Sequence, residues 1–587
     1  MRSYPALANG KLYVRNERTL ACFDLRYWPR VAVCLRVRRA AIINEATAAQ
    51  VVNESCHRMR RSGFVRATSF QLEWQNSRMS NWPAGPVIYE INTAAWLNQL
   101  TEQCDTTITL GIVPQFELER LAALQVDGLW LMGVWQRSPA SQAIAQMDQG
   151  LQSEYRRALP DCTPEDVLGS PYAVYKYEVD SRFGGDGALR DLRRRLRELD
   201  IRLILDFVPN HLARDHEWVQ KHPEHLVQGT NADLRDRPHE YFASGGRVFA
   251  HGRDPNFPGW TDTVQIDYRR PETRRAIIDV LCSLSNLCDG LRCDMAMLVT
   301  ANVFRRTWGG GCEPSGAEFW VDAIRALKSI NPGFLVAAEV YWGLEYELQQ
   351  QGFDYTYDKR LYDRLLGSDA EQIRRHLLAE IDYQRRLMRF IENHDEGRAV
   401  TMFGAARSMA VATAALTLPG ARLIHEGQIE GNAIRVPVQL RRRPAEASHA
   451  ALEDFYRRLL RGLKLSPFHE GDWRLLQCRE AWPSNGTYWN FVAHRWTERD
   501  QVLLIVANVS DQPAQCCLPL EFPALTGCTW DLCDLLHDVR YEREGDAMLD
   551  PGLYLDVPGY GHHIFQFRLK DRQIPAGVSR SGSLCAK

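Results

Sequence analysis

From residue 86 onward, two kinds of segment alternate along the chain. Short apolar runs are followed by longer runs whose apolar residues recur every three or four positions, as in ALRDLRRRLRELD (188–200). The short runs predict buried strands and the longer ones amphipathic helices. Eight strands are predicted, at residues 86–92, 128–135, 202–208, 289–296, 334–341, 353–358, 388–395 and 421–428. Because strands and helices alternate, we expect an α/β fold of the (β/α)8 TIM-barrel type.

Two segments depart from this alternation. After the third strand, about fifty residues rich in Pro, Gly, His and Asp precede the next helix, so we expect an inserted domain at about residues 211–265. Following a barrel over residues 85–455, short strands separated by turn residues predict a C-terminal antiparallel β-sandwich domain at residues 456–570. Residues 571–587 are small and polar, and we expect a loose tail.

Composition describes a soluble globular protein. Of 587 residues, 45% are hydrophobic and 25% charged, and no apolar run reaches the length of a membrane span. The N-terminal stretch has no apolar core typical of a signal peptide. The fifteen cysteines are scattered without a CxxC pair, which favours reduced thiols and a cytoplasmic location. We expect no membrane partner, and oligomeric state stays open.

Charge is unevenly distributed. The net charge is −2, yet residues 1–84 carry fourteen Lys and Arg against five Asp and Glu. A basic arm can bind nucleic acid, but this segment contains no nucleic-acid-binding motif, so we expect no such partner. Met79 begins a stretch that reads like a natural start. We therefore treat residues 1–84 as a separate N-terminal segment and expect it to be poorly ordered.

Polar side chains occur where four of the predicted strands end. For any one of them a structural role, such as capping a loop or pairing with a basic neighbour, is a strong alternative. Four strands with the same feature are harder to explain in this way, because unpaired buried charges are costly. The carboxyl ends of barrel strands converge on one site. The residues concerned are Asp206, Asn210, His211, Arg292, Asp294, Glu339, Asn393, His394 and Asp395.

Three carboxylates and an arginine suit retaining glycoside hydrolysis. That reaction needs an ionised carboxylate nucleophile and a protonated carboxylic acid, ~5–5.5 Å apart. Crowding by other carboxylates keeps the acid protonated. Arg292 and Asp294 are two positions apart, which is the strand period, so both point to one face and Arg292 can keep Asp294 ionised. Cys293 between them faces away and is expected to pack.

These segments resemble the four conserved regions of glycoside hydrolase family 13, the α-amylase family. DFVPNH resembles the first region, GLRCDMAML the second, AAEVYW the third and FIENHD the fourth, in the right order. SPYAVYKYEVDSRFGG resembles the segment before the first region, and LTLPGARLIHEGQ resembles the eighth strand. The resemblance covers roughly residues 85 to 570.

The resemblance implies a role for each matching residue. Asp294 would be the nucleophile, Glu339 the general acid and then base, and Asp395 the group that holds the sugar's 2- and 3-hydroxyls. Arg292 would keep Asp294 ionised. The remaining roles are sugar hydrogen bonds from His211 and His394, ring stacking by Tyr172 (or, alternatively, a place in the core), and support of the site by Asp206 and Asn210.

Two departures from the family pattern concern the leaving-group side and calcium. Many α-amylases carry a Lys-His pair three and four residues after the nucleophile, where this chain has Met297 and Leu298. The change removes polar contacts and one contributor to the family's calcium site. Asn210 matches a family calcium ligand, but alone it is weak support. We therefore expect no cofactor and no bound metal.

The expected function is hydrolysis of α-1,4-glucosidic bonds in α-glucans such as starch or glycogen, or in maltooligosaccharides, with retention. Transglycosylation, as in a trehalose-forming isomerase or a glucanotransferase, uses the same residues and stays open. A non-enzymatic carbohydrate-binding or partner protein is disfavoured, because all three carboxylates are present.

Overall fold

The structure is a computed structural model that describes residues 6–8, 11–15, 20–24, 82–309, 318–367 and 369–572. Two compact units divide the chain, residues 1–75 and residues 76–587. The first contains a three-stranded antiparallel sheet of β1 (Ala6–Ala8), β2 (Lys11–Arg15) and β3 (Leu20–Asp24). The rest of the segment 1–84, for which we expected poor order, lies outside the described residues apart from 82–84. The expected tail at 571–587 also lies outside them, except that residues 571 and 572 end a strand of the C-terminal domain.

Eight parallel strands of the second unit form a closed barrel, which confirms the predicted fold. Each lies within or close to its predicted segment, and the last strand pairs with the first. In chain order they are β4 (Val87–Asn92), β5 (Gly128–Met132), β8 (Arg202–Phe207), β14 (Gly290–Cys293), β15 (Leu335–Ala338), β16 (Tyr355–Tyr357), β17 (Leu387–Arg389) and β18 (Ala421–His425).

Burial explains the alternation seen in the sequence. Every residue of β4, β5 and β14 is buried, as expected for parallel strands covered on both faces. Helix α6 (Gly185–Arg197) instead buries one stripe formed by Leu189, Leu192 and Leu196 and exposes several of its arginines.

The inserted domain after β8 is present. Its two ends pair antiparallel, with His211 opposite Gln265, so the insertion closes at its base beside the barrel. The paired ends are β9 (His211–Ala213) and β13 (Thr263–Gln265). Between them lie α7 (Trp218–Lys221), α8 (Asn231–Asp236) and a sheet of β10 (Gln228–Gly229), β11 (Tyr241–Ser244) and β12 (Arg247–Ala250).

A second insertion, after β5, was not predicted. It contains α4 (Pro139–Met147) and α5 (Gln149–Ala158), between β6 (Trp135–Arg137) and β7 (Val174–Val179). Both helices carry N-cap signals in the sequence: the Ser138 hydroxyl accepts from Ser141 N–H (2.9 Å), and Asp148 accepts from Leu151 N–H (2.8 Å). This insertion forms part of the cleft described below.

The C-terminal region is an antiparallel sandwich. A six-stranded sheet faces a two-stranded one, and a separate apolar core that includes Leu504, Cys516, Leu555 and Phe565 lies between them. The larger sheet runs in the order β19 (Asp472–Leu476), β20 (Phe491–Glu498), β21 (Gln501–Asn508), β26 (His562–Arg572), β23 (Cys528–Asp534) and β24 (Arg540–Glu544). The smaller sheet pairs β22 (Ala514–Leu518) with β25 (Leu553–Val557).

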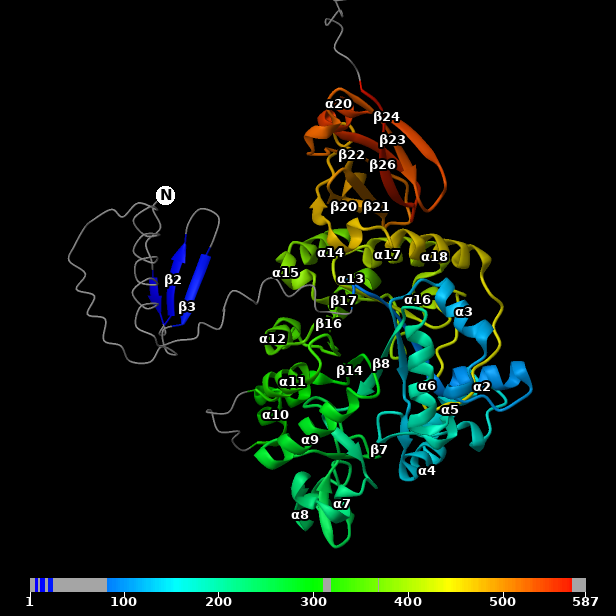
Figure 1. Cartoon of the computed structure of the whole chain (residues 1–587), viewed down its shortest axis with the longest axis vertical. Helices are drawn as coiled ribbons and strands as arrows, with labels where there is room; N and C mark the ends of the chain where they lie inside the picture. The colour runs from blue at the N-terminus through cyan, green and yellow to red at the C-terminus, as the bar shows by residue number, and fades with distance from the viewer. Residues whose placement is uncertain are drawn as a thin grey trace, which may run out of the picture. The chain divides into compact units, whose positions relative to one another are not determined.

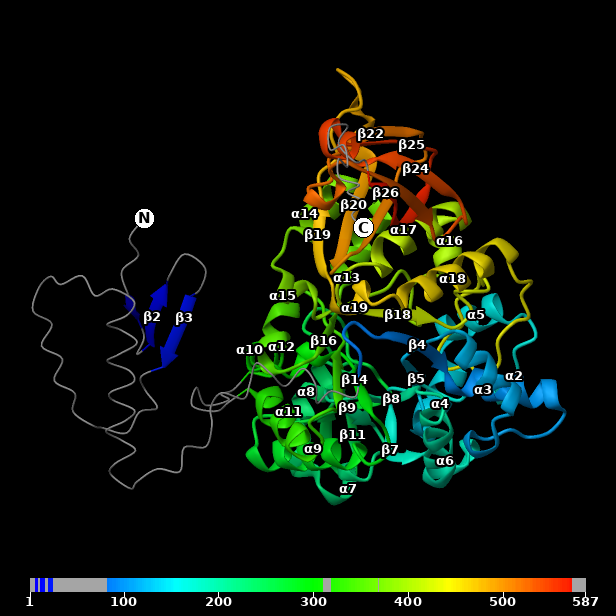
Figure 2. The same ribbon diagram turned by 45° about the horizontal axis from the view of Figure 1, so that its top comes forward.

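Helices separate this sandwich from the barrel strands. Figures 1 and 2 show α17 (Ala405–Leu416) and α18 (Ala450–Leu463) beneath the sheet, while α7 lies at the opposite end of this unit. The Trp496 indole N–H donates to the Thr417 carbonyl (2.8 Å), which ties the sheet to the end of α17. Because α18 spans the predicted domain boundary at 455–456, we place that boundary after Leu463.

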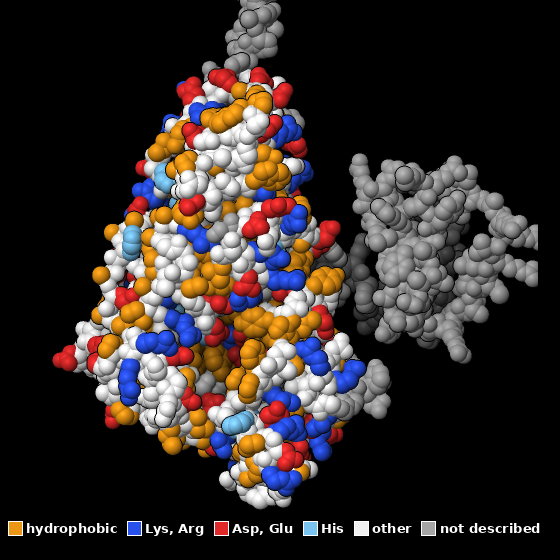
Figure 3. Space-filling view, turned by 180° about the vertical axis from the view of Figure 1, so that it is seen from behind, with side chains coloured by type: hydrophobic (Ala, Val, Ile, Leu, Met, Phe, Trp, Pro, Cys, Tyr) orange, Lys and Arg blue, Asp and Glu red, His pale blue; other side chains and the backbone are white. Residues whose placement is uncertain are grey.

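The helices and the surface charges bear on whether the chain meets a membrane or a nucleic acid. Among the described residues, no helix combines the length and apolar character needed to cross a membrane. On the face shown in Figure 3, basic and acidic side chains are interspersed rather than gathered in one basic patch.

Candidate active site

Two carboxylates stand side by side where β14 and β15 end. Cys293 pairs with Ala338 in the parallel ladder, which continues one step further as Glu339 N–H donates to the Cys293 carbonyl (3.0 Å). On the other side, Asp294 N–H donates to the Phe207 carbonyl at the end of β8 (2.8 Å). The backbone therefore fixes Asp294 and Glu339 as neighbours at the carboxyl end of the barrel, where active sites of this fold lie.

Arg292 connects these carboxylates inside the barrel. It lies opposite Asp206 in the β14–β8 ladder, and its side chain is 2% exposed. Nη1 donates to Asp294 Oδ1 (2.9 Å) and Nη2 to Glu339 Oε2 (2.6 Å), while Nη1 lies 3.8 Å from Asp206 Oδ1. One buried guanidinium thus faces three carboxyl groups, of which the sequence spacing predicted only Asp294.

Glu339 is held at both oxygens. Met295 adopts a left-handed backbone with φ of 40°, unusual for a residue with a side chain, and its N–H donates to Glu339 Oε2 (2.8 Å). The Tyr341 hydroxyl donates to Oε1 (2.7 Å). A turn immediately after Asp294 therefore positions the neighbouring carboxylate.

His394 organises the opposite wall. Its Nε2 lies 3.1 Å from Asp395 Oδ2 and 2.7 Å from the Tyr172 hydroxyl oxygen, and its Nδ1 contacts the buried carboxylate of Glu90. Burial opposes protonation, but the charges of Asp395 and Glu90 hold the pKa of His394 well above its usual value. Burial likewise opposes ionisation of Asp395, yet charged His394 keeps the pKa of Asp395 below its usual value. The Asp395 side chain is 46% exposed and faces solvent as an anion.

The buried carboxyls titrate differently. Burial raises the pKa of Asp294 to about 8; the charge of Glu339 adds to this effect and Arg292 opposes it. Burial also raises the pKa of Asp206 to about 6, against the charge of Arg292. We expected the raised pKa on the acid, Glu339, and expected Arg292 to keep Asp294 ionised. The raised pKa lies on Asp294 instead, because burial outweighs the effect of Arg292. Burial and the charge of Glu339 outweigh the single guanidinium, so Asp294 retains a proton around neutral pH.

A cleft opens above these groups and brings in both insertions. The inserted domain contributes Trp260, whose ring centre lies 5.0 Å from that of His211. Burial lowers the pKa of His211 to about 4, so its imidazole is neutral. The second insertion contributes Asp148 and other residues of α4 and α5. Predicted and newly found residues meet here: the lining includes Tyr172, His211, Trp260, Asp294, Met295, Glu339, Tyr341 and Asp395.

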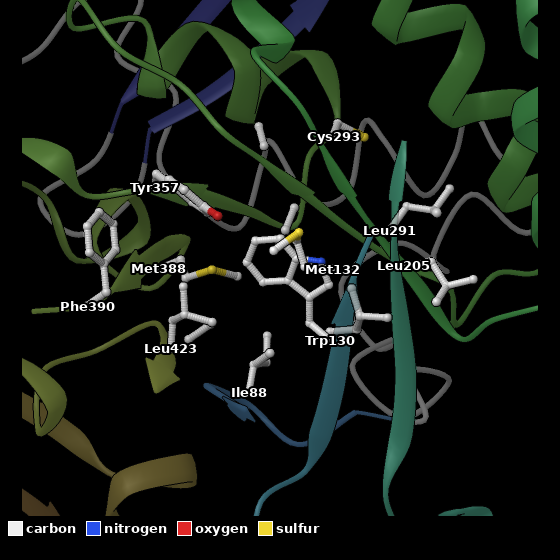
Figure 4. Close-up of a cluster of buried hydrophobic side chains, with 14 of the residues drawn as sticks. Ile88, Trp130, Met132, Leu205, Leu291, Cys293, Tyr357, Met388, Phe390 and Leu423 are labelled. Carbon is white, nitrogen blue, oxygen red and sulfur yellow. The ribbon is translucent and has the colours of Figure 1, made fainter. Parts of the chain in front are cut away.

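Aromatic rings surround Arg292 below the cleft. Its guanidinium carbon lies 5.3 Å from the ring centre of Trp130, 5.2 Å from that of Tyr172 and 5.8 Å from that of Tyr357. The Trp130 indole N–H also donates to Asp206 Oδ1 (3.1 Å). Figure 4 shows Trp130 and Tyr357 among buried side chains from several barrel strands. These contacts restrict the arginine to one orientation.

Comparison with known proteins identifies the family to which the chain belongs. The sequence model for the alpha amylase catalytic domain matches residues 110–436, more than half of the chain. The chain belongs to the alpha-amylase family. The resemblance inferred from the four sequence motifs is thereby confirmed.

Individual family members are distant. Alpha-amylase MalA of Haloarcula japonica is 25% identical over 456 residues, which cover 75% of this chain and 57% of that protein. Alpha-amylase 3 of Dictyoglomus thermophilum is 22% identical over 43% of this chain and 52% of its own length. The chain thus spans little more than half the length of these relatives. The maltogenic alpha-amylase AmyB of Thermotoga neapolitana shares the fold, with a TM-score of 0.59, 20% identity, and coverage of 84% of this chain and 99% of its own.

The family's Lys-His pair has no polar replacement at the same positions. Met297 and Leu298 lie in a short 3-10 helix (Ala296–Val299) and are buried. Both side chains pack in the barrel core. On this side of Glu339, the cleft is instead lined by Met295 and Tyr341.

Asn210, which matches a family calcium ligand, is hydrogen-bonded within the protein. Its side-chain oxygen accepts from Gln265 Nε2 (3.1 Å), and its amide nitrogen lies 3.3 Å from His211 Nδ1. Asn210 therefore links β8 to the base of the inserted domain.

Sequence reasoning missed several residues of the site. Glu90 is buried in β4 and contacts His394, and the lone acid within PVIYEIN was an available signal. Tyr341 follows Glu339 by two positions, which would have placed both on one face of an extended strand. Trp130 and Trp260 gave no comparable signal, because a tryptophan in an apolar strand or a long loop is common in protein cores.

Proposed function

We propose that this chain is a retaining α-glycosidase that hydrolyses α-1,4-glucosidic bonds in α-glucans or maltooligosaccharides. The observation that carries the proposal is the pair of carboxylates, Asp294 and Glu339, joined by buried Arg292 at the floor of the cleft. The reaction requires Asp294 ionised and the proton on Glu339, so the proton that Asp294 holds in the free protein must pass to Glu339 when substrate binds.

The first step breaks the glycosidic bond. An oxygen of Asp294 attacks the anomeric carbon and forms a covalent ester, while Glu339 gives its proton to the departing glycosidic oxygen. In the second step Glu339 takes a proton from water, whose oxygen attacks the same carbon and releases Asp294. Two inversions give net retention, and all protons are returned.

Neighbouring groups position the sugar. Asp395, ionised and 46% exposed, can accept hydrogen bonds from two sugar hydroxyls. His394, held in orientation by Glu90 and Tyr172, presents a charged imidazole next to it. Neutral His211 can donate to or accept from a hydroxyl, and Tyr172 offers a ring face in the same cleft.

Transglycosylation is the second candidate, and it is favoured by the apolar and aromatic residues that line the acceptor side of the cleft. Next to Glu339 the wall carries Met295 and Tyr341, and Trp342 follows with 44% exposure. A second sugar can pack its ring against such apolar and aromatic side chains and so compete with water as the acceptor. Which acceptor reaches the ester decides between hydrolysis and transfer.

A product profile tests both candidates. The protein is incubated separately with maltose, maltoheptaose, soluble starch and sucrose, and products are separated by chromatography beside the Glu339→Gln variant. We expect shorter maltooligosaccharides from starch and maltoheptaose, absent with the variant. Trehalose from maltose, or chains longer than the input, would establish transfer instead. No change in any substrate would contradict the enzyme proposal.

The pH profile follows from the carboxylate pair. Because burial raises the pKa of Asp294 to about 8, the pair loses its last proton as pH rises through that value, and no acid remains for the leaving oxygen. We expect kcat/KM to fall above about pH 8 and on the acid side once the pair is doubly protonated. Asp395, whose pKa is lowered, stays ionised over this range. A profile that stays flat between pH 7 and 10 would contradict the assignment.

A further inference from the structure

A second group of ionisable side chains lies outside the cleft, in the C-terminal sandwich. Asp534 is the last residue of β23, His537 lies in the turn that follows, and His563 lies at the start of β26. We call these three residues the Asp534 cluster. One ligand-type atom from each lies within 4.8 Å of the other two.

Both imidazoles converge on the same carboxylate oxygen. His537 Nδ1 lies 2.8 Å, and His563 Nδ1 2.7 Å, from Asp534 Oδ2. The other oxygen, Oδ1, accepts from Leu536 N–H (3.0 Å), which fixes the carboxylate plane. Two imidazole nitrogens and one carboxylate oxygen, all atoms that commonly ligate metals, are therefore close enough to bind one ion.

The cluster is rigid on one side and open on the other. Asp534 N–H donates to the Val539 carbonyl (2.8 Å), and Leu535 N–H donates to the Ile564 carbonyl of the neighbouring strand (2.9 Å), so a tight turn and two paired strands hold all three residues. The Asp534 side chain is fully buried, whereas His563 is 18% and His537 44% exposed. An ion from solvent can therefore reach ligands that are already in place.

We propose that the Asp534 cluster binds a divalent transition-metal ion, with zinc as the representative of its class. Two imidazole nitrogens and one carboxylate oxygen match the ligand preference of zinc, whereas calcium prefers oxygen ligands alone. In the bound state each imidazole carries its proton on Nε2, which leaves the Nδ1 lone pair for the ion. Ligand atoms around zinc lie ~3.3 Å apart, so the two nitrogen–oxygen separations open by about half an ångström.

The other candidate in the described part of the chain lacks these features. His222, Glu224 and His225 lie next to α7 in the inserted domain, and their ligand-type atoms also fall within 4.8 Å of one another. However, His222 and Glu224 are about half exposed, and no buried acid anchors the group. Ordering exposed side chains costs conformational entropy. This group serves as the matched control for the Asp534 cluster.

Metal content tests the proposal directly. The full chain is freed of metal, dialysed against zinc chloride and measured by mass spectrometry, beside His537→Ala, His563→Gln and the control His225→Ala. We expect wild type and control to bind one zinc ion that both cluster variants bind at least ~10-fold more weakly. Because His537 is partly exposed, its replacement is expected to leave the fold intact. Equal zinc content in wild type and His537→Ala would overturn the proposal.

Cobalt distinguishes this cluster from the cysteines. The chain contains fifteen cysteines, which can bind zinc nonspecifically. Cobalt bound by histidine and carboxylate gives visible d–d absorption without the near-ultraviolet thiolate charge-transfer band. We expect such a spectrum in wild type and its loss in His537→Ala, together with a zinc-dependent rise in melting temperature confined to wild type and control. Cobalt absorption with a thiolate band in every variant would count against the cluster.

Discussion

Replacing Asp294 by Asn is expected to lower kcat/KM on maltoheptaose by a factor on the order of 10⁴ or more. An amide keeps the shape of the side chain and its place beside Arg292, but it cannot form the covalent ester. The measurement is the initial rate of release of reducing ends at pH 7. Mass spectrometry of wild type quenched during turnover of a slow fluorinated glucosyl substrate should place the added mass on the peptide containing Asp294.

Asp289 provides the matched control at the other end of the same strand. Its buried carboxylate accepts from Arg193 (2.8 Å) and from Leu203 N–H (3.0 Å) at the amino end of β14. Asp289→Asn should change stability but leave kcat/KM per folded molecule within about threefold, because barrel sites lie at the carboxyl end. If both variants lost activity equally, the loss would reflect folding and not chemistry.

Asp294→Asn should also remove a cost to folding. The pKa of Asp294 is raised in the folded state, so the folded protein binds the extra proton between about pH 4 and 8 and loses stability as pH rises through that window. The amide has no such dependence. A melting temperature at pH 8.5 no lower than that of wild type is the expected sign that inactivity does not arise from unfolding.

Replacing Arg292 by Met is expected to destabilise the protein by ~3–5 kcal/mol, because it leaves buried carboxylates without their counter-charge. The guanidinium contacts Asp294 and Glu339 directly and lies 3.8 Å from Asp206. Protonation of these carboxyls relieves the cost, so the fall in melting temperature should be larger at pH 8.5 than at pH 5.5. Thermal unfolding followed by circular dichroism at both pH values measures the difference.

Arg190→Met serves as the comparison for that experiment. Arg190 lies on α6 with its side chain 58% exposed, 3.6 Å from Asp186 in the preceding turn, so its loss should cost at most ~1 kcal/mol at either pH. A shift for Arg292→Met that matches this control, or that does not depend on pH, would show that Arg292 does not balance the buried carboxylates.

The fold was accessible from sequence because its signals are local. Each barrel strand is a short apolar run and each helix has its own apolar stripe, as Leu189, Leu192 and Leu196 show in α6. The inserted domain was visible as a break in this rhythm. The second insertion was missed because the strand predicted at 128–135 ran directly into it, and its capping residues Ser138 and Asp148 were not recognised as helix starts.

The site was only partly accessible, for a different reason. Residues that match family motifs, such as Asp294 and His394, could be carried over by position. Contacts between distant segments could not: the Glu90 carboxylate meets His394 across the closure of the barrel. The placement of the raised pKa on Asp294 depends first on how deeply that carboxyl is buried and then on the charges around it, and spacing along a strand reveals neither.

The pairing of the first barrel strand with the last has a consequence for biosynthesis. Val87 in β4 lies beside Arg422 in β18, and Glu90 beside His425. At ~5–20 residues per second, the ribosome needs roughly 20–70 s to reach β18 after completing β4. Throughout that interval one edge of β4 has no partner strand, and the nascent chain exposes a site for incorrect pairing. Slower growth at lower temperature, or a chaperone that shields this edge, should therefore increase the yield of soluble protein.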